Sequence, residues 1–491
     1  MAIMTAAPPA SARFGPDVRY HALRARDRRF DGTFFVGVRT TGIYCRPVCR
    51  ARLPQAKNCA FYESAAAAER AGYRPCLRCR PELAPGRSLT DAHARLAGAA
   101  YARIAAGALN AGSVADVARE LCVSERQLRR AVVAEFGASP VELAQTQRLL
   151  LAKQLLTETD LPIAQVAFSS GFASLTRFNA LFLARYRMSP TRLRRERGDR
   201  AAAGVTLRFA YRPPFDWERL LGFLAKRAIP GVERVDGTSY ARTLRVGAHA
   251  GWLRVRHVPA DATLAVEVSD TLLPALMPLR AGLRRLFDLD AEPDVIAAHF
   301  ANDPLLGPLV RARPGLRLPG CADPFEVAVR AVLGQQVSVA AAITLAGRLT
   351  AAVGEPIAGA PEGLTHLGVG AERIAATAPE VIASLGMPLA RARTLVTLAR
   401  AVAAGDVTID AAQDPDAAIA ALRGLPGIGP WTAAYIAMRG LHWPDAFPAG
   451  DAGVRNALGG ADPATASRLA EAWRPWRAYA VLHLWESLAA T

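Results

Sequence analysis

The stretches TTGIYCRPVCR (residues 40–50) and RPCLRCR (residues 74–80) hold four of the seven cysteines in this chain of 491 residues. The first pair is spaced Cys-x3-Cys and the second Cys-x2-Cys, with residues 50–75 between them. Two short-spaced pairs can place four thiolates around one tetrahedral zinc ion, with Zn–S bonds of about 2.3 Å. The spacing therefore predicts one zinc ion per chain, held by Cys45, Cys49, Cys76 and Cys79. It leaves two alternatives open, a purely structural zinc and four unrelated buried cysteines.

The composition is that of a folded, globular chain. Hydrophobic residues make up 51% and charged residues 21% of the sequence, which is not the composition of a disordered protein. A length of 491 residues is enough for roughly three or four domains of ordinary size. No apolar run reaches the roughly 18 residues that a membrane span needs, and the start MAIMTAAPPASARFG lacks the pattern of a secretory signal. We therefore expect a cytoplasmic protein that makes no membrane contact.

The chain is strongly basic, with a formal net charge of +17 and an isoelectric point near 10.3. Each lysine or arginine that meets a nucleic-acid phosphate releases a condensed counterion, so this charge favours a nucleic acid as the partner. The alternative is that this composition, rich in arginine and poor in lysine, partly reflects a GC-rich genome, since lysine occurs only at positions 57, 153 and 226. The odd number of cysteines argues against a disulfide framework and for metal or thiol chemistry.

Four segments differ in their sequence pattern, and we expect a multi-domain fold that is mainly α with smaller α+β parts. Residues 1–88 hold five cysteines and short strand-like runs, whereas residues 89–200 have a helical pattern rich in Ala, Leu and Arg. Residues 204–295 return to alternating strand-like runs such as GWLRVRHV. Residues 296–491 are again helical and are broken by Gly/Pro turns, which indicates an all-helical domain.

The second segment contains an internal repeat. Residues 114–140 and 163–190 each run from a short helix through a turn to a longer helix and end in Ser-Pro. This pattern is typical of a helix-turn-helix, whose second helix presents polar and basic side chains to DNA. A helical bundle with a solvated basic face is the alternative for either copy alone. The candidate DNA-binding residues are Arg126, Gln127, Arg129 and Arg130 in the first copy and Ser174, Thr176, Arg177 and Asn179 in the second.

The cysteine-rich segment resembles the N-terminal zinc domain of bacterial Ada adaptive-response proteins, through FFVGVRTTGIYCRPVCRAR (34–52) and AGYRPCLRCRPE (71–82). The resemblance implies that Cys45 irreversibly accepts a methyl group from a DNA methylphosphotriester. The physical chemistry agrees, because zinc keeps the sulfur as a thiolate nucleophile and a methylated phosphate carries no charge.

Alkylation would remove one negative charge from the cluster and so weaken its repulsion of DNA phosphates. Arginines near the ligands would then bind the phosphates more tightly. These arginines are Arg46, Arg50, Arg52, Arg74, Arg78 and Arg80. Cys59 matches no ligand position, and we expect it to be a packing residue.

The block PIAQVAFSSGFASLTRFNALFLARYRMSPTRLR (162–194) resembles the AraC-type DNA-binding domain, which follows the zinc domain in Ada proteins. This resemblance implies a transcription activator that binds promoter DNA, works with RNA polymerase and acts at the nucleoid. The second alkyl acceptor of the Ada family, a cysteine in a Pro-Cys-His-Arg motif, has no counterpart, since Cys122 and Cys321 are the only cysteines beyond Cys79. We therefore predict no O6-alkylguanine transferase activity.

The last segment carries a glycine hairpin followed by an acidic residue. In LPGIGPWTAAYIAMRG (425–440), Gly427 and Gly429 open a helix, where backbone N–H groups can hold a DNA phosphate. A plain connection between two helices is the alternative for this turn. Asp451 follows in FPAGDAGVRNAL (447–458), in a Gly/Pro-rich turn before another helix. Helix, hairpin, helix and acid is the order found in helix-hairpin-helix DNA glycosylases.

Longer blocks across residues 205–491 resemble AlkA, the 3-methyladenine DNA glycosylase II family. They are YRPPFDWERLLGFLAKRAI (211–229), ARPGLRLPGCADPFEVAVRAVLGQQVSVAAA (312–342), ASLGMPLARA (383–392), the hairpin block and WRPWRAYAVLHLW (473–485). The resemblance implies that Asp451 is the catalytic acid side chain, although it could also serve as a plain helix N-cap. It further implies that Trp431, Tyr435 and Trp485 border the base pocket.

By the same resemblance, Gln335 lies in the loop that enters the DNA, and Gln336 stands where AlkA-like enzymes can place an apolar wedge. No lysine occurs in residues 227–491, and Trp431 occupies the hairpin position where lyase relatives carry one. Because strand cleavage generally needs an amine that forms a Schiff base, we predict base excision without β-elimination. The segment also lacks four cysteines for an iron–sulfur cluster.

These inferences combine into one expectation: a methyl-sensing transcription activator fused to a monofunctional glycosylase that acts on double-stranded DNA. The expected domains are an Ada-like zinc domain (1–88), an AraC-type double helix-turn-helix (89–200), an AlkA-like α+β domain (204–295) and a helix-hairpin-helix glycosylase domain (296–491). Two alternatives stay open, a zinc-dependent regulator whose C-terminal half binds DNA without catalysis, and a glycosylase with a purely structural zinc.

Overall fold

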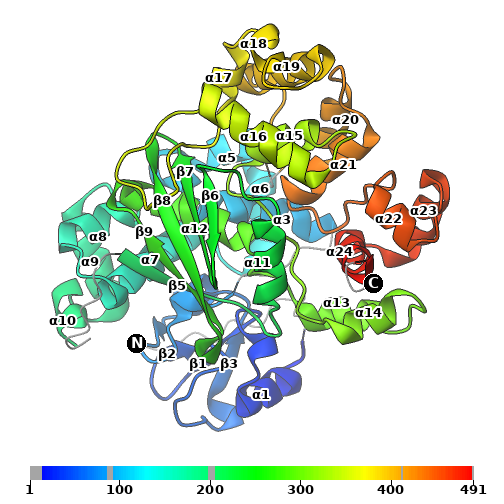
Figure 1. The fold of residues 1–491 in the computed structure, drawn as a ribbon. Helices are drawn as coiled ribbons and strands as arrows, with labels where there is room; N and C mark the ends of the chain where they lie inside the picture. The colour runs from blue at the N-terminus through cyan, green and yellow to red at the C-terminus, as the bar shows by residue number, and fades with distance from the viewer. Residues whose placement is uncertain (1–13, 86–91, 197–204, 411–412, 489–491) are drawn as a thin grey trace. The chain divides into compact units, whose positions relative to one another are not determined.

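The computed structural model describes residues 14–85, 92–196, 205–410 and 413–488, and Figure 1 shows its fold. The chain divides into two compact units. The N-terminal unit comprises the described residues of Met1–Pro213, Val258–Ala281 and Leu289–Glu292, and the C-terminal unit comprises those of Pro214–His257, Gly282–Asp288 and Pro293–Thr491. The expectation of a multi-domain, mainly helical chain with smaller sheet-containing parts is confirmed.

The first part of the N-terminal unit is a small four-stranded sheet in the order β3-β1-β2-β4. In chain order, this part of the unit contains α1 (Pro16–Ala25), η1 (Arg28–Phe30), β1 (Phe35–Val38), β2 (Ile43–Cys45), η2 (Ala56–Asn58), β3 (Cys59–Tyr62), α2 (Ala65–Arg70), β4 (Arg74–Pro75) and η3 (Pro81–Leu83). β1 pairs antiparallel with β2 and β3, whereas β2 pairs parallel with β4, with Tyr44 opposite Pro75. Tyr44 is fully buried with its ring edge against Phe35, which fixes the strand before Cys45 in the core.

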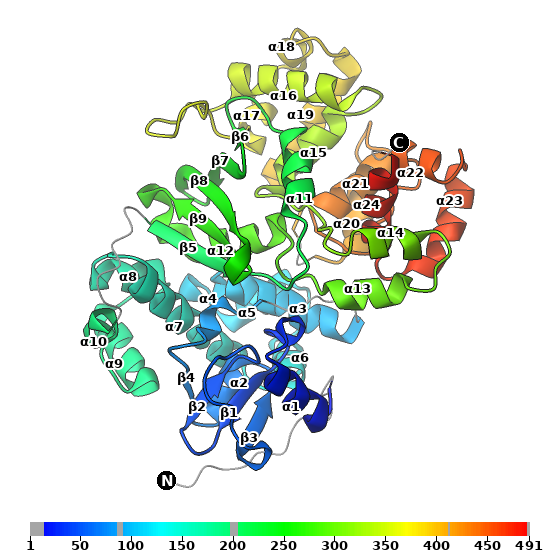
Figure 2. The same ribbon diagram turned by 60° about the horizontal axis from the view of Figure 1, so that its bottom comes forward.

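A run of helices follows in the described residues of the N-terminal unit. They are α3 (Ala92–Ala105), α4 (Ala108–Ala111), α5 (Val114–Glu120), α6 (Glu125–Phe136), α7 (Pro140–Glu158), α8 (Ile163–Ser169), α9 (Leu175–Tyr186) and α10 (Pro190–Arg195). The long helix α7 is buried along most of its length and contacts α2, α3, α8 and α10. Figure 2 shows α8, α9 and α10 grouped together beside α7.

The two halves of the sequence repeat adopt the same local structure. Ser124 caps α6 by accepting the N–H of Gln127, and Ser174 caps α9 by accepting the N–H of Arg177. Each cap is followed by apolar residues that are buried at four-residue intervals. These residues are Leu128, Val132 and Phe136 in α6, and Phe178, Phe182 and Tyr186 in α9. The predicted pair of helix-turn-helix structures is therefore present.

Strands of the third sequence segment occur in both units. In the N-terminal unit, β5 (Val205–Ala210) pairs antiparallel with β9 (Thr263–Val268), and η4 (Pro259–Asp261) and η5 (Asp270–Ala275) flank β9. In the C-terminal unit, β6 (Glu233–Asp236), β7 (Ser239–Val246) and β8 (His249–Val258) form an antiparallel meander after α11 (Trp217–Ala225). Only Val258, the last residue of β8, is assigned to the N-terminal unit. Helix α12 (Leu276–Leu286) begins in the first unit and ends in the second.

The rest of the C-terminal unit is helical. Its helices are α13 (Pro293–Phe300), α14 (Leu306–Ala312), α15 (Pro324–Leu333), α16 (Val339–Val353), α17 (Ala371–Ala375), α18 (Pro379–Ala383), α19 (Leu389–Ala404), α20 (Pro415–Arg423), α21 (Pro430–Arg439), α22 (Ala452–Ala457), α23 (Pro463–Ala470), η6 (Glu471–Trp473) and α24 (Arg477–Leu488). Within the part of the chain that the structure describes, no helix is long and apolar enough to cross a membrane.

The turn between α20 and α21 has the geometry expected of a glycine hairpin. Gly427 has a φ of +84°, and a Cβ at this position would lie 2.0 Å from Thr394 Oγ1, so only glycine fits. Gly429 is the N-cap of α21, and Asp451 is the N-cap of α22. The helix, hairpin, helix and acid of the sequence motif therefore form one continuous stretch of the C-terminal unit.

Candidate functional site

The four predicted ligands lie together in the N-terminal unit. The Sγ atoms of Cys45, Cys49, Cys76 and Cys79 are all within 4.8 Å of one another. The parallel pairing of β2 with β4 brings the two sequence pairs together, and the N–H of Cys76 donates to the carbonyl of Tyr44 at 3.0 Å. Four sulfurs on a tetrahedron with bonds of about 2.3 Å would be about 3.8 Å apart, which this cluster can match. The donor set fits a single zinc ion.

The arginines near the cluster have different environments, which the sequence could not show. Arg46 is buried and forms a two-pronged ion pair with Asp31, and it also donates to the carbonyl of Cys79 at 3.0 Å. Arg80 pairs with Glu82 and Glu158. Both guanidinium groups therefore form ion pairs with acidic side chains of the same unit. Arg50, Arg52 and Arg78 are exposed and remain candidates for DNA phosphates.

The other described cysteines lie apart from the cluster. Cys59 is buried against Phe34 and Val36, in agreement with a packing role, and burial raises the pKa of its thiol. Cys122 is exposed in the turn of the first helix-turn-helix, and Cys321 lies in the C-terminal unit. In the described ranges, the four-cysteine cluster is the one group of His, Cys, Asp and Glu side chains close enough to hold a metal.

The eight predicted DNA-binding residues of the repeat lie near the N-terminal ends of α6 and α9, and all eight are exposed. They do not form one cluster, because each set belongs to its own helix-turn-helix. Two of the side chains have local partners: Arg129 pairs with Glu125, and the hydroxyl of Ser174 caps its own helix. The other six side chains are exposed at the same helix ends.

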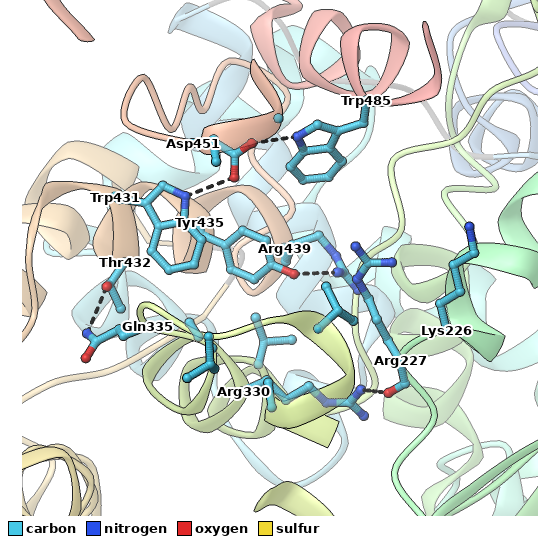
Figure 3. Close-up of a pocket in the computed structure, with 18 of the residues that line it drawn as sticks. Lys226, Arg227, Arg330, Gln335, Trp431, Thr432, Tyr435, Arg439, Asp451 and Trp485 are labelled. Carbon is cyan, nitrogen blue, oxygen red and sulfur yellow. Dashed lines mark hydrogen bonds between the residues drawn. The ribbon is translucent and has the colours of Figure 1, made fainter. Parts of the chain in front are cut away.

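The C-terminal unit contains a cavity of about 1600 Å³ that gathers every residue predicted there (Figure 3). Asp451, Trp431, Tyr435 and Trp485 line it together with the loop residue Gln335. The hairpin residues Gly427 and Gly429 also reach the cavity. These side chains come from α21, α24, the loop after α15 and the N-cap of α22, and they are separated by up to 150 positions in the sequence.

Asp451 is held in one orientation by three N–H donors. Trp431 Nε1 donates to Asp451 Oδ2 at 3.0 Å, and Trp485 Nε1 donates to Asp451 Oδ1 at 2.8 Å (Figure 3). Asp451 Oδ1 also caps α22 by accepting the N–H of Val454 at 3.0 Å. The residue is therefore both a helix cap and a fixed acid facing the cavity. Two indole rings clamp the carboxylate and also supply flat apolar faces beside it.

Another part of the cavity lining combines aromatic rings with arginines. Trp431 and Tyr435 stack with ring centroids 5.4 Å apart, and Arg439 Nη1 donates to the Tyr435 hydroxyl at 3.1 Å. The guanidinium groups of Arg227 and Arg439 lie 3.8 Å and 4.6 Å from the centroid of the Phe223 ring. Burial acts to raise the pKa of Tyr435, but the nearby arginines outweigh it, so this pKa lies below its ordinary value.

Sequence reasoning missed Phe223, Arg227 and Arg439 as cavity residues. Phe223 lies in α11 and Arg227 two residues after its end, while Arg439 is the last residue of α21. Each lies in a block that resembles AlkA, so the signal was present, but helical spacing alone marks such residues as ordinary surface or core positions. Lys226, the C-cap of α11, also lines the cavity and lies on the opposite side from Asp451 in Figure 3.

Gln335 does not point freely outward from its loop. Its side-chain amide nitrogen donates to the carbonyl of Gly427 at 2.9 Å and to Thr432 Oγ1 at 3.1 Å, and its backbone carbonyl accepts from Arg391 at 2.6 Å. Gln336 follows with a φ of +55° and is exposed at the cavity. Gln335 therefore ties the loop to the hairpin, whereas the side chain of Gln336 is exposed at the cavity.

Four family models match the chain. The metal binding domain of Ada matches residues 18–82, and a helix-turn-helix domain matches residues 117–196. The AlkA N-terminal domain matches residues 206–323, and the HhH-GPD superfamily of base excision DNA repair proteins matches residues 329–476. The four matches follow one another in the order expected from the sequence.

Known proteins resemble the whole chain or its second half. A Mycobacterium tuberculosis (strain CDC 1551 / Oshkosh) protein described as "Probable bifunctional transcriptional activator/DNA repair enzyme AlkA" is 42% identical over 96% of this chain and 96% of its own length. The Escherichia coli (strain K12) protein DNA-3-methyladenine glycosylase 2 is 42% identical over 56% of this chain and 95% of its own length. A solved 3-methyladenine DNA-glycosylase from Archaeoglobus fulgidus shares the fold at a TM-score of 0.50, with 21% identity, over 57% of this chain and 96% of that one.

Proposed function

The chain belongs to the family of bifunctional transcriptional activator/DNA repair enzymes, and we propose that its C-terminal unit excises alkylated bases by hydrolysing the N-glycosidic bond. The observation that carries this proposal is the clamped carboxylate of Asp451 beside Trp431, Tyr435 and Trp485 in one cavity. The substrate class is double-stranded DNA that carries 3-methyladenine-type lesions, as the names of the similar proteins suggest.

The chemistry follows from the charge of the lesion. An N-alkylated purine carries positive charge, which weakens its glycosidic bond and favours stacking on electron-rich aromatic faces. Flipping the nucleotide out of the duplex costs roughly a few kcal/mol, which stacking in the cavity offsets. Asp451 would then lie near C1′ and stabilise an oxocarbenium-like transition state while water attacks. Because two indoles and a backbone N–H hold the carboxylate, little reorganisation is needed when positive charge develops.

Base release from alkylated DNA by the purified full chain tests this half of the proposal. We expect Asp451→Asn to lower kcat by about 10²–10³-fold, because one fixed charge at the reacting centre is lost. Asp462→Asn is a matched control, since Asp462 caps α23 in the same manner and does not line the cavity. Equal activity of the Asp451→Asn and Asp462→Asn proteins would remove the catalytic assignment and favour a regulator that binds DNA without catalysis.

The excision is proposed to be monofunctional. Schiff-base chemistry needs an amine, and Lys226 is the single lysine in the C-terminal unit. Trp431, not a lysine, occupies the position beside Asp451. We expect borohydride to trap no covalent adduct between the protein and abasic DNA, and an adduct on Lys226 would contradict this part.

For the N-terminal unit, we propose methyl transfer from a DNA methylphosphotriester to Cys45 and activation of transcription through both helix-turn-helix repeats. Zinc, when bound, keeps the acceptor sulfur as a thiolate. Exposed Arg50, Arg52 and Arg78 can then bind neighbouring phosphates once the cluster has lost a negative charge. We also propose that the activator works with RNA polymerase and associates with the nucleoid. The proposed domains are residues 1–88, 89–200, 204–295 and 296–491.

Peptide mapping after exposure to methylphosphotriester DNA tests the sensor. We expect one added methyl group on Cys45, and tighter binding of promoter DNA by the methylated protein. Cys59→Ser should leave both results unchanged, because Cys59 lies outside the cluster. A protein that binds zinc but gains no methyl group would show that the metal is purely structural.

A further inference from the structure

We propose that the zinc centre stabilises the first strand of the AlkA-like part, β5, through a buried chain of polar contacts carried by helix α7. This inference concerns the described residues of the N-terminal unit alone, to which the cysteine cluster, α7 and β5 all belong. It adds to the proposed function a physical link from the sensor to the AlkA-like part.

The chain of contacts begins at a metal ligand. Lys153, in the middle of α7, donates from Nζ to the carbonyl of Cys76 at 3.2 Å and forms an ion pair with Glu82. The side chains of Lys153 and Glu82 are 1% and 0% exposed. Burial acts to raise the pKa of Glu82, but Lys153 and Arg80 outweigh it, so this pKa lies below its ordinary value and the acid stays charged. A buried pair of this kind depends on each partner, because either charge alone would be costly in the interior.

The next step runs through Arg80, which directly follows the ligand Cys79. Arg80 has a φ of +55°, a left-handed conformation that is unfavourable for a residue with a side chain. Its guanidinium group donates to Glu82 Oε1 at 3.1 Å and pairs with Glu158 Oε1 at 2.9 Å. The position of Arg80 next to the ligand Cys79 therefore links its backbone conformation and the placement of its guanidinium group to the zinc site. Glu158 is the last residue of α7, so the chain of contacts returns to this helix.

The last step reaches the backbone of β5. Gln154 Nε2 donates to the carbonyl of Arg208 at 2.9 Å, and Glu158 Oε2 accepts the N–H of Arg208 at 3.2 Å. Arg208 is opposite Ala265 in the pairing of β5 with β9, so α7 supplies partners on the other side of the strand. Side chains of α7 thus complete the hydrogen bonds of a strand that otherwise offers unpaired backbone groups to solvent. The short helix η3, which contains Glu82, also packs against β5.

The physical consequence is a dependence of β5 on the metal. Without a bound ion, the ligand loop is no longer held, and Arg80 and Lys153 lose the geometry that balances Glu82 and Glu158. Removing one partner of a buried ion pair is strongly destabilising, so the local structure relaxes until water reaches these groups. The contacts of Gln154 and Glu158 with Arg208 loosen with it, and β5 opens more often.

Amide hydrogen exchange of the full chain measures this effect. We expect a zinc chelator to speed exchange of residues 205–210 by about tenfold or more, because local opening sets the exchange rate of strand amides. The amides of β7 in the C-terminal unit serve as the internal reference and should keep their rates. Unchanged exchange of β5 while residues 74–83 exchange faster would overturn the proposal.

Two variants identify the route. In the zinc-loaded Lys153→Met protein, β5 should already exchange faster, and the chelator should add less than it adds to the unmodified chain. Lys57→Met is the matched control, since Lys57 is exposed on the same zinc-binding part and its variant should keep the full response. If Lys153→Met fails to retain zinc, Gln154→Met is the decisive variant, because it removes the hydrogen bonds of Gln154 to Arg208 and Glu158 without removing a charge. A Gln154→Met protein whose β5 exchange matches that of the unmodified chain, with and without zinc, would refute the route through α7.

Discussion

The cysteine cluster and the Asp451 cavity differ in how the chain builds them. All four sulfurs come from residues 45–79, and one parallel strand pair, β2 with β4, is enough to bring them within 4.8 Å of one another. The cavity instead draws Gln335, Trp431, Asp451 and Trp485 from four separate parts of the C-terminal unit. The residues of a local site can be predicted from their spacing in the sequence. The residues of a site that forms by long-range packing can be identified only from a resemblance to a known family or from the structure.

The two sites also stabilise their reactive groups by different means. The thiolates of the cluster repel one another and need a cation to stay together. The carboxylate of Asp451 needs none, since Trp431, Trp485 and the N-terminus of α22 supply its partners. We therefore expect the first site to depend on metal and the second to depend on packing, and the following predictions test this contrast.

The largest effect should come from removing a zinc ligand. Cys76→Ser is expected to abolish tight zinc binding and unfold the cysteine-rich part, since structural zinc contributes about 10–16 kcal/mol in small zinc domains. Metal analysis and circular dichroism measure the loss. All seven tryptophans lie in the C-terminal unit, so tryptophan fluorescence should stay native. A large fluorescence change would show that the cavity also needs the metal.

Acid should weaken the C-terminal unit through His483 in α24. Burial, and to a smaller extent Arg313, lower the pKa of His483 to about 4. The unfolded chain takes up this proton near pH 6.5, so stability is complete above that pH and is lost as the pH falls toward 4. The shift corresponds to about 3 kcal/mol. Urea unfolding followed by tryptophan fluorescence at pH 7.5 and 4.5 measures it.

The comparison variant for that experiment is His483→Leu, which cannot titrate and should lose less stability on acidification. His21→Leu, at an exposed histidine of the N-terminal unit, should behave like the unmodified chain. If His483→Leu and the unmodified chain lose equal stability, another group controls the acid response.

A smaller loss is expected at the hairpin. Gly427→Ala would place a Cβ 2.0 Å from Thr394 Oγ1, and overpacking of this kind costs about 1–3 kcal/mol. Gly405→Ala is the matched control, because Gly405 has a similar φ of +80° but no atom within 4 Å of the new Cβ. Denaturant midpoints and DNA affinity should both fall further for Gly427→Ala. Equal losses would mean that backbone strain, and not the contact with Thr394, explains the glycine.

An effect of similar size, but on catalysis and not on stability, should follow from loosening the clamp on Asp451. Trp485→Phe keeps an aromatic face but loses the N–H that Asp451 Oδ1 accepts, and a charged hydrogen bond contributes about 1.5–3 kcal/mol. We expect kcat for base release to fall about tenfold or more with little change in KM. Trp252→Phe, whose indole donates to Gly359 away from the cavity, should have no effect on kcat. A rise in KM alone would assign Trp485 to stacking and not to orientation.

The sequence by itself determined the features that depend on neighbours along the chain. The Cys-x3-Cys and Cys-x2-Cys pairs, the repeated helix-turn-helix with its serine caps and buried apolar stripe, and the hairpin before Asp451 each have a local physical cause. Resemblance added the aromatic residues of the cavity. The family matches confirm the order of these parts.

Tertiary structure alone decided which polar groups meet across the fold. Six arginines near the zinc ligands look alike in sequence, yet Arg46 and Arg80 turn inward to Asp31, Glu82 and Glu158. The clamp of Trp485 on Asp451 and the contact of Lys153 with Cys76 join residues 34 and 77 positions apart. Charge and hydropathy mark such residues as solvent-facing, and only burial against a distant partner reverses that assignment, because the partner offsets the cost of leaving water.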